Sequence, residues 1–274
     1  MDILGPNPGT HAGRLPFPLH QSRLSGTAGP GRFPELHLYH GSRCNRACAF
    51  CTVNGQPGGW HAAFPREALD AALRWIDPAG NLKVYGGEPT LDLPSLLDAF
   101  RYLRAGGFTG WLTVFSNGVL PDRVIALLEA DPLTEVVLNH SILHGIDAEP
   151  LPVEAGAMLE RWANAQPGRL FASHPDLVPV GRGAAFLTAH SAERGLFGGS
   201  CPRCYPVLTS RGTLHACPFA VEIDLPHHRL EGPGGSGALA VASHARFLAW
   251  IDTELEPRAH AAGLHPCVAC AGGR

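Results

Sequence analysis

Hydrophobic and polar residues alternate along the middle of the chain in a strand-then-helix rhythm. From residue 35 onward, short apolar runs are each followed by a longer segment whose apolar positions recur with helical spacing. Such alternation predicts a parallel sheet with right-handed crossovers, either open or curled into a barrel. The expected strands cover residues 35–40, 82–85, 111–115, 135–139 and about 170–172, and the expected helices cover residues 66–76, 93–104, 122–129 and 152–165.

The two ends of the chain lack this rhythm. Residues 1–34 are rich in proline and glycine without a period, so we expect a flexible arm outside the core. After about residue 183 the pattern breaks into short strands, glycine-rich turns and cysteines, with one helix expected over residues 243–255. We therefore predict an α/β fold with a partial (β/α) barrel of the TIM type over residues 35–182 and a small C-terminal domain over residues 183–274. Between Leu170 and Gly183 there is room for a short strand and an extended segment but for no intervening helix, which predicts a truncated barrel.

Composition narrows the class of protein. The chain has 274 residues, 45% of them hydrophobic, which is enough for one large and one small domain. A net charge of −3 gives no electrostatic footprint for nucleic acid, and no apolar run is long enough to span a bilayer. Without a signal segment at the N-terminus we expect a cytoplasmic protein with no membrane partner. In that reducing compartment, eight cysteines favour metal ligation or catalysis over disulfides.

Three of the cysteines form one compact motif. Cys44, Cys48 and Cys51 directly follow the first expected strand, at the carboxyl end of the sheet, where parallel α/β folds bind ligands. Three thiolates suit an iron–sulfur cluster that leaves one iron open to an exogenous ligand, whereas structural zinc takes four closed ligands. A zinc knuckle completed by His40 or His61 is the alternative.

The spacing Cys-x3-Cys-x2-Cys, with aromatic Phe50 before the last cysteine, resembles the signature of the radical S-adenosylmethionine (radical SAM) superfamily. Other stretches agree with that family in order along the chain. Each alone could be an ordinary turn, but each follows an expected strand, which favours the resemblance. These stretches are Gly86-Gly87-Glu88-Pro89, Ser116-Asn117-Gly118, and the pair Asn139 and Ser141.

The resemblance implies a [4Fe-4S] cluster on the three cysteines that binds S-adenosyl-L-methionine (AdoMet). An external one-electron reductant such as flavodoxin or ferredoxin would drive cleavage of AdoMet to a 5′-deoxyadenosyl radical, which abstracts hydrogen from a small-molecule or peptide substrate. Beyond the cluster, we assign no catalytic residue. Cofactor contacts are implied for Phe50 near the adenine, Gly86, Gly87, Glu88 and Pro89 near the methionyl amine, Ser116 and Asn117 after the third strand, Asn139 and Ser141 near the ribose, and Arg182, for which a solvated turn position is the alternative.

The remaining five cysteines lie in the C-terminal part. Their spacing resembles the SPASM and twitch extensions of radical SAM enzymes, which carry auxiliary clusters. A hairpin at Gly212 would bring Cys217 beside Cys201 and Cys204. Five thiols are too few for two full clusters, so we expect one auxiliary [4Fe-4S] cluster and leave open which four bind. Zinc is the alternative metal. The full set is Cys201, Cys204, Cys217, Cys267 and Cys270.

The sequence therefore predicts a radical SAM enzyme, either an oxidoreductase or another enzyme that modifies C–H bonds. A non-catalytic iron–sulfur electron carrier and a zinc-organised interaction module are the alternatives. None of the fifteen histidines is assigned a role, because no spacing typical of histidine ligands recurs.

Overall fold

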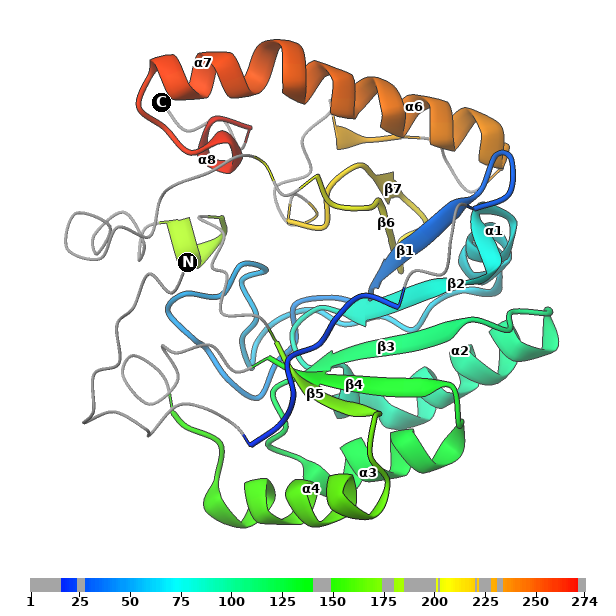
Figure 1. Ribbon diagram of the computed structural model, residues 1–274, viewed down its shortest axis with the longest axis vertical. Helices are drawn as coiled ribbons and strands as arrows, with labels where there is room; N and C mark the ends of the chain where they lie inside the picture. The colour runs from blue at the N-terminus through cyan, green and yellow to red at the C-terminus, as the bar shows by residue number, and fades with distance from the viewer. Residues whose placement is uncertain are drawn as a thin grey trace.

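A single mostly parallel sheet organises the molecule (Figure 1). The computed structural model describes residues 16–23, 28–139, 149–173, 180–184, 201, 203–219, 221, 228–230 and 234–270. The strands, in spatial order β5-β4-β3-β2-β1-β6-β7, form one seven-stranded sheet. Their bounds are β1 Phe33–Tyr39, β2 Ile76–Tyr85, β3 Trp111–Ser116, β4 Thr134–Leu138, β5 Leu170–Ala172, β6 Val207–Thr209 and β7 Leu214–His215.

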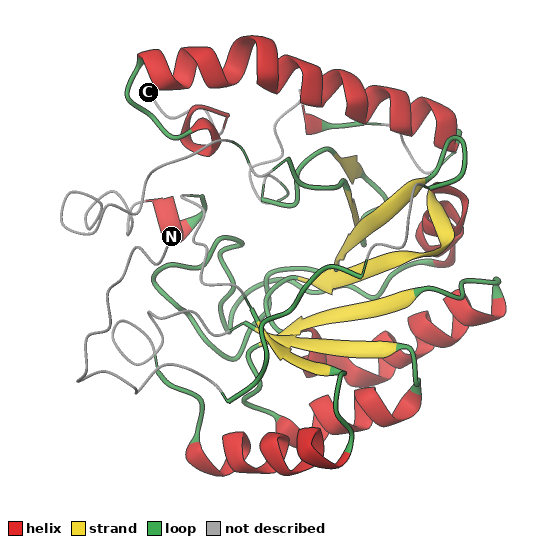
Figure 2. Ribbon diagram, in the orientation of Figure 1, coloured by secondary structure: helices red, strands yellow, loops and turns green. Residues whose placement is uncertain are grey.

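Helices connect the first five strands and cover one face of the sheet (Figure 2). The helix-facing side chains of the strands, such as Leu36, Leu82 and Leu112, are fully buried against them. Burial on this face explains the apolar alternation read from the sequence, and it confirms the predicted strand and helix order. The crossover helices are α1 Arg66–Trp75, α2 Leu93–Ala105, α3 Pro121–Ala130 and α4 Val153–Ala165.

Charged and polar side chains lie on the opposite face of the sheet. Glu35 of β1 forms an ion pair with Lys83 of β2, with 2.7 Å between Oε2 and Nζ, and its Oε1 lies 2.9 Å from Nε2 of His37. Glu35 is largely buried, yet contacts with His37 and Lys83 outweigh that burial and lower its pKa to about 2. On this face the buried charged side chains are therefore stabilised by ion pairs and not by apolar packing.

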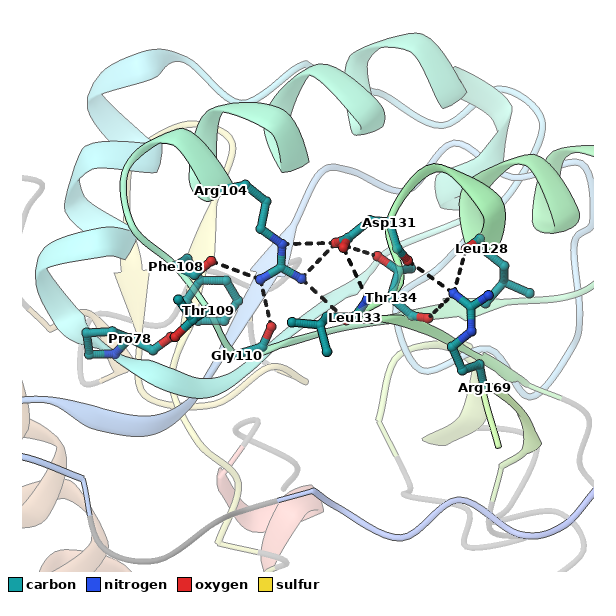
Figure 3. A network of polar contacts seen from close by, with 10 residues as sticks. All are labelled: Pro78, Arg104, Phe108, Thr109, Gly110, Leu128, Asp131, Leu133, Thr134 and Arg169. Carbon is teal, nitrogen blue, oxygen red and sulfur yellow. Dashed lines mark hydrogen bonds and ion pairs between the residues drawn. The ribbon is translucent and has the colours of Figure 1, made fainter. Parts of the chain in front are cut away.

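A second polar network fixes the amino ends of β3, β4 and β5 (Figure 3). Arg104 contacts Asp131, with 2.7 Å between Nη2 and Oδ2, and donates to the carbonyl oxygens of Phe108 and Gly110. Arg169 donates to the carbonyl oxygen of Leu128 in the last turn of α3 at 2.6 Å and to that of Asp131 at 3.1 Å. The network lies at the end of the sheet away from the cysteine loop, so its role is to hold the connections together.

The N-terminal segment departs from the prediction. Residues 16–23 run along β5: Leu19 forms a parallel bridge with Ala172, and the Phe17 side chain is only 8% exposed within the main core. His20 and Arg23 both contact the buried carboxylate of Glu135, at 2.7 and 2.5 Å. The described part of this segment therefore belongs to the core, and its expected exclusion was wrong. Burial of Phe17 and the contacts of His20 and Arg23 with Glu135 hold the segment in place despite its proline and glycine content.

The C-terminal part also differs from expectation. β6 pairs in parallel with β1, so residues expected in a separate domain extend the main sheet. The helix expected from residue 243 begins earlier, as α6 Gly237–Trp250, because the Ser236 side chain caps it by accepting from the Leu239 N–H. A π-helical turn, Ile251–Leu255, leads into α7 Glu256–Ala261, and α8 Pro266–Cys270 follows.

Among the described residues, no hydrogen bonding joins β5 to β7, and closure into a barrel is not observed there. Within the same described part of the chain, no helix has both the length and the apolar character that crossing a membrane requires.

Candidate functional site

The three-cysteine loop leaves the carboxyl end of β1 and folds back on itself. Cys44 N–H donates to the carbonyl oxygen of Gln56 at 2.9 Å, and Gln56 N–H donates to that of Ser42 at 2.9 Å. Cys51 N–H closes a turn by donating to the Cys48 carbonyl oxygen at 3.1 Å. These backbone bonds hold all three cysteines in one short loop at the predicted edge of the sheet.

Several N–H groups point at the sulfur atoms. The Cys44 Sγ accepts from the Arg46 backbone N–H at 3.4 Å and from Asn117 Nδ2 at 3.6 Å. The Cys51 Sγ accepts from the Gly55 backbone N–H at 3.1 Å. Hydrogen bonds to sulfur stabilise thiolates, the form in which cysteine binds metal.

Burial acts in the opposite direction on these thiols. It raises the pKa of Cys44 to about 11 and also raises the pKa of Cys48. No three His, Cys, Asp or Glu side chains of the described residues stand in metal-binding geometry. The fit to an iron–sulfur cluster therefore rests on the donor set, three cysteines on one loop with N–H groups directed at two of them. A metal would supply the positive charge that buried thiolates need.

The Gly86-Gly87-Glu88-Pro89 motif lies directly against this loop. Gly87 N–H donates to the Gly41 carbonyl oxygen at 2.8 Å, and Glu88 N–H donates to that of Arg43 at 2.9 Å. A Cβ atom at Gly87 would lie 2.0 Å from the Arg43 carbonyl oxygen, so only glycine fits there. The close approach makes the motif a backbone support for the cysteine loop.

Glu88 does not face a cation in this structure. Its carboxylate is 1% exposed and accepts four hydrogen bonds from the protein. Oε1 accepts from Thr90 N–H at 3.1 Å, from Thr90 Oγ1 at 2.6 Å and from Ser116 Oγ at 2.9 Å, and Oε2 accepts from Asn117 N–H at 2.7 Å. Burial raises the pKa of Glu88 despite these bonds. The carboxylate therefore ties the end of β2 to β3, and its implied contact near the methionyl amine stays a prediction.

Pro89 and Phe50 are both buried beside the loop. Pro89 begins the short 3-10 helix Pro89–Asp92, and Phe50 is 7% exposed between the second and third cysteines. Neither position contradicts the contacts implied by the family resemblance, which stay predictions.

Asn117 joins the end of β3 to the cysteine loop. Besides contacting the Cys44 Sγ, its Nδ2 donates to Asn45 Oδ1 at 2.7 Å. Asn139 follows β4 with an exposed side chain, and its N–H donates to the Ser116 carbonyl oxygen at 2.7 Å. Ser141 lies outside the described residues. The ends of β1 to β4 thus meet as the sequence predicted, although ribose contacts stay a prediction.

Arg182 binds the cysteine loop. Its guanidinium donates to the carbonyl oxygens of Cys48 at 3.1 Å, Asn54 at 3.4 Å and Gly55. Its backbone N–H donates to Asn54 Oδ1 at 2.9 Å. These contacts make Arg182 a clamp on the loop, and its implied contact with the cofactor stays a prediction.

The two histidines considered for a zinc knuckle contact each other. His40 Nδ1 lies 2.9 Å from His61 Nδ1, and His61 Nε2 lies 2.8 Å from Asp92 Oδ2. Burial lowers the pKa of His40 to about 3, so its ring is neutral. The hydrogen bonds of these two rings therefore join them to each other and to Asp92, and among the described residues none joins them to a cysteine.

The second set of cysteines surrounds one cavity. β6 and β7 form the predicted hairpin, with Gly212 in the left-handed region at φ 80°. One cavity in this part of the molecule is lined by all five thiols. The lining cysteines are Cys201, Cys204, Cys217, Cys267 and Cys270.

The thiols in this cavity interact with one another. A hydrogen bond with Cys267 lowers the pKa of Cys201 to about 7, and burial raises the pKa of Cys270 to about 12. As at the first site, the fit to a metal centre rests on the donor set, five thiols that line one cavity. The structure does not separate four of them from the fifth.

Sequence reasoning missed His228. Its Nε2 lies 2.8 Å from the Cys270 Sγ, and its side chain lines the same cavity. The one available signal was its position, eleven residues after Cys217 in the cysteine-rich part of the chain.

One short segment connects the two cysteine sites. Val180 lines the C-terminal cavity, while Arg182, two residues later, holds the first loop. Tyr85 of β2 also donates its hydroxyl to the Pro218 carbonyl oxygen at 2.6 Å, next to Cys217. The two sites are therefore parts of one continuous structure.

Comparison with known proteins places the first site in a family. Residues 38–148 match the model of the radical SAM superfamily. No curated protein matches the chain.

A solved structure with a TM-score above 0.5 shares the fold. Native anSMEcpe with bound AdoMet is 14% identical, with a TM-score of 0.51 over 80% of this chain and 84% of that one. BtrN in complex with AdoMet and 2-DOIA is 16% identical, with a TM-score of 0.48 over 80% and 86%. At such identities the likeness concerns the fold alone. The family match alone shows a radical SAM domain, over residues 38–148.

Proposed function

We propose that this protein is a radical SAM enzyme with an auxiliary iron–sulfur centre, acting on a small-molecule or peptide substrate. The observation that carries the proposal is the loop of Cys44, Cys48 and Cys51, held against Gly87 at the carboxyl end of the sheet. With a [4Fe-4S] cluster and AdoMet bound, this site would supply reductive cleavage of AdoMet and hydrogen abstraction from the substrate.

The chain's own residues position and shield that chemistry. Arg182 and the backbone of Gly87 fix the loop, and Asn117 supplies an N–H group to Cys44. Cys44 itself is 8% exposed, so the loop limits access of water to the reacting group. An external reductant such as flavodoxin or ferredoxin is part of the proposal.

The second site supports an auxiliary centre. Its five thiols line a cavity that Val180 also lines, and Arg182, two residues later, holds the first loop. We propose that one [4Fe-4S] cluster is bound there and either holds the substrate or accepts an electron from it.

Reductive cleavage of AdoMet tests the proposal. Anaerobically reconstituted protein should convert AdoMet to methionine and 5′-deoxyadenosine when supplied with dithionite. Single Cys44→Ala, Cys48→Ala and Cys51→Ala variants should lose this conversion and keep the C-terminal metal, because the two sites use separate ligands.

The outcomes separate the alternatives. Cleavage that survives in all three variants would refute the assignment. A reversible redox signal without any cleavage would indicate an electron carrier, and tightly bound zinc without iron would indicate an interaction module.

A further inference from the structure

His228 occupies a defined place beside the C-terminal thiols. Its carbonyl oxygen accepts from Ala216 N–H at 2.7 Å, so its backbone is tied to the residue before Cys217. Its ring packs edge-on against Phe247, with 5.2 Å between ring centroids and an interplanar angle of 88°. At 2% exposure the residue is fixed from both sides.

The ring is directed at a sulfur atom. Nε2 lies 2.8 Å from the Cys270 Sγ, and both residues line the cavity that the other four cysteines share. The imidazole is therefore part of the C-terminal site, although it was not among the ligands expected from the spacing of the cysteines.

We propose that His228 is a positioning residue of the auxiliary centre, which donates its Nε2–H to the thiolate of Cys270. This inference rests on the proposed function, since it assumes a cluster in the cavity. Hydrogen bonds to cluster sulfur atoms are among the factors that set reduction potentials. A donor here stabilises the more negative, reduced state and raises the potential.

The separation favours a hydrogen bond over direct ligation. Two ligands of one metal, at bond lengths of about 2.0 and 2.3 Å in tetrahedral geometry, stand more than about 3 Å apart. The observed 2.8 Å between Nε2 and Sγ is shorter than that separation and lies within hydrogen-bonding distance of a sulfur acceptor.

The experiment isolates the auxiliary centre. A chain with Cys44, Cys48 and Cys51 all changed to Ala carries only the C-terminal site, so its potential can be titrated without interference. In that background His228→Leu should keep about four irons and shift the midpoint potential to a more negative value. His228→Gln, which retains a donor near the Nε2 position, should recover most of the shift. His260→Leu is the matched control, since His260 is exposed on α7.

Three results would overturn the inference. The first is a midpoint potential that is the same in the background chain and in its His228→Leu and His228→Gln variants. The second is strong nitrogen coupling in pulsed EPR together with loss of iron in both His228 variants, which would make His228 a ligand. The third is a background chain without iron, which refutes the auxiliary cluster itself and is recognised before any His228 variant is made.

Discussion

At the scale of single residues, Arg182 shows how a charged side chain can serve a metal site without touching the metal. Its guanidinium bonds to three carbonyl oxygens of the cysteine loop, including that of Cys48. Lysine keeps the charge but cannot reproduce this planar set of donors.

We therefore expect Arg182→Lys to retain its first cluster poorly. Each hydrogen bond to a charged donor is worth about 1.5–3 kcal/mol, so loss of two should weaken retention by more than about tenfold. Iron content and AdoMet cleavage after gel filtration measure this. The control is Arg43→Lys, because Arg43 lies in the same loop with its side chain exposed. Equal iron in both variants would contradict the clamp.

Glu88 carries a second prediction at this scale. Glutamine has one acceptor oxygen, so Glu88→Gln keeps the bonds to Oε1 only by placing an amide N–H against the Asn117 N–H. The buried mismatch should reduce the free energy of unfolding by about 1–3 kcal/mol. Urea denaturation of the metal-free chain measures it, with exposed Glu154→Gln as the control. A Glu88→Gln variant that is as stable as the wild type but binds AdoMet more weakly would indicate that Glu88 contacts the cofactor directly.

The sequence was informative about which residues lie at the site and less so about what their side chains contact. Cysteine spacing and the Gly86-Gly87 pair predicted the first loop, because spacing and backbone approach are local properties. The partners of Glu88 and Arg182 are distant along the chain, and only the packed fold determines them. His228 was missed for the same reason.

At the scale of elements, alternation of apolar residues predicted the order of β1 to β5 and their helices. The alternation did not predict segments that contain few apolar residues. The N-terminal strand-like segment depends on Phe17 and on the ion pairs to Glu135, which show no period. α6 begins before residue 243 because of the Ser236 cap, which follows a glycine-rich turn.

Phe17→Ala tests whether the N-terminal segment belongs to the core. Removal of a buried phenylalanine ring should reduce the free energy of unfolding by about 3 kcal/mol. Leu19→Ala is the control, since Leu19 is 48% exposed in the same segment, and it should change little. Equal small effects of the two substitutions, measured by thermal or urea unfolding, would return the segment to a peripheral arm.

At the scale of the whole molecule, the sheet runs through the expected domain boundary. β6 pairs with β1, and α6 is tied to α1 by Trp75, whose Nε1 donates to the Gly235 carbonyl oxygen at 3.2 Å. Sequence patterns gave no sign of this, because a three-residue strand has no measurable period. The domain boundary near residue 182 therefore stays a prediction about function, because the sheet contains strands from both sides of it.

The far end of the C-terminal part has little apolar support of its own. Its buried cluster is small, and the cysteines pack around it. The four buried members are Ala216, Phe247, Ile251 and Leu255. A metal that forms bonds only in the folded state would contribute its binding free energy to this region.

Changing Cys267 and Cys270 together to Ser should therefore loosen this region and leave β1 to β4 intact. Reconstituted wild type should hold about eight irons per chain and the double variant about four, since the proposed function gives each site one four-iron cluster. Hydrogen exchange should accelerate over residues 201–219 and 251–270 but not over β1 to β4. The Cys44→Ala, Cys48→Ala, Cys51→Ala chain is the reciprocal control, because it should lose four irons with no change in exchange at the C-terminal site. Wild type with about four irons and one zinc would instead make this region a structural zinc module. Unchanged exchange in the double variant would show that packing around Phe247 holds the region without metal.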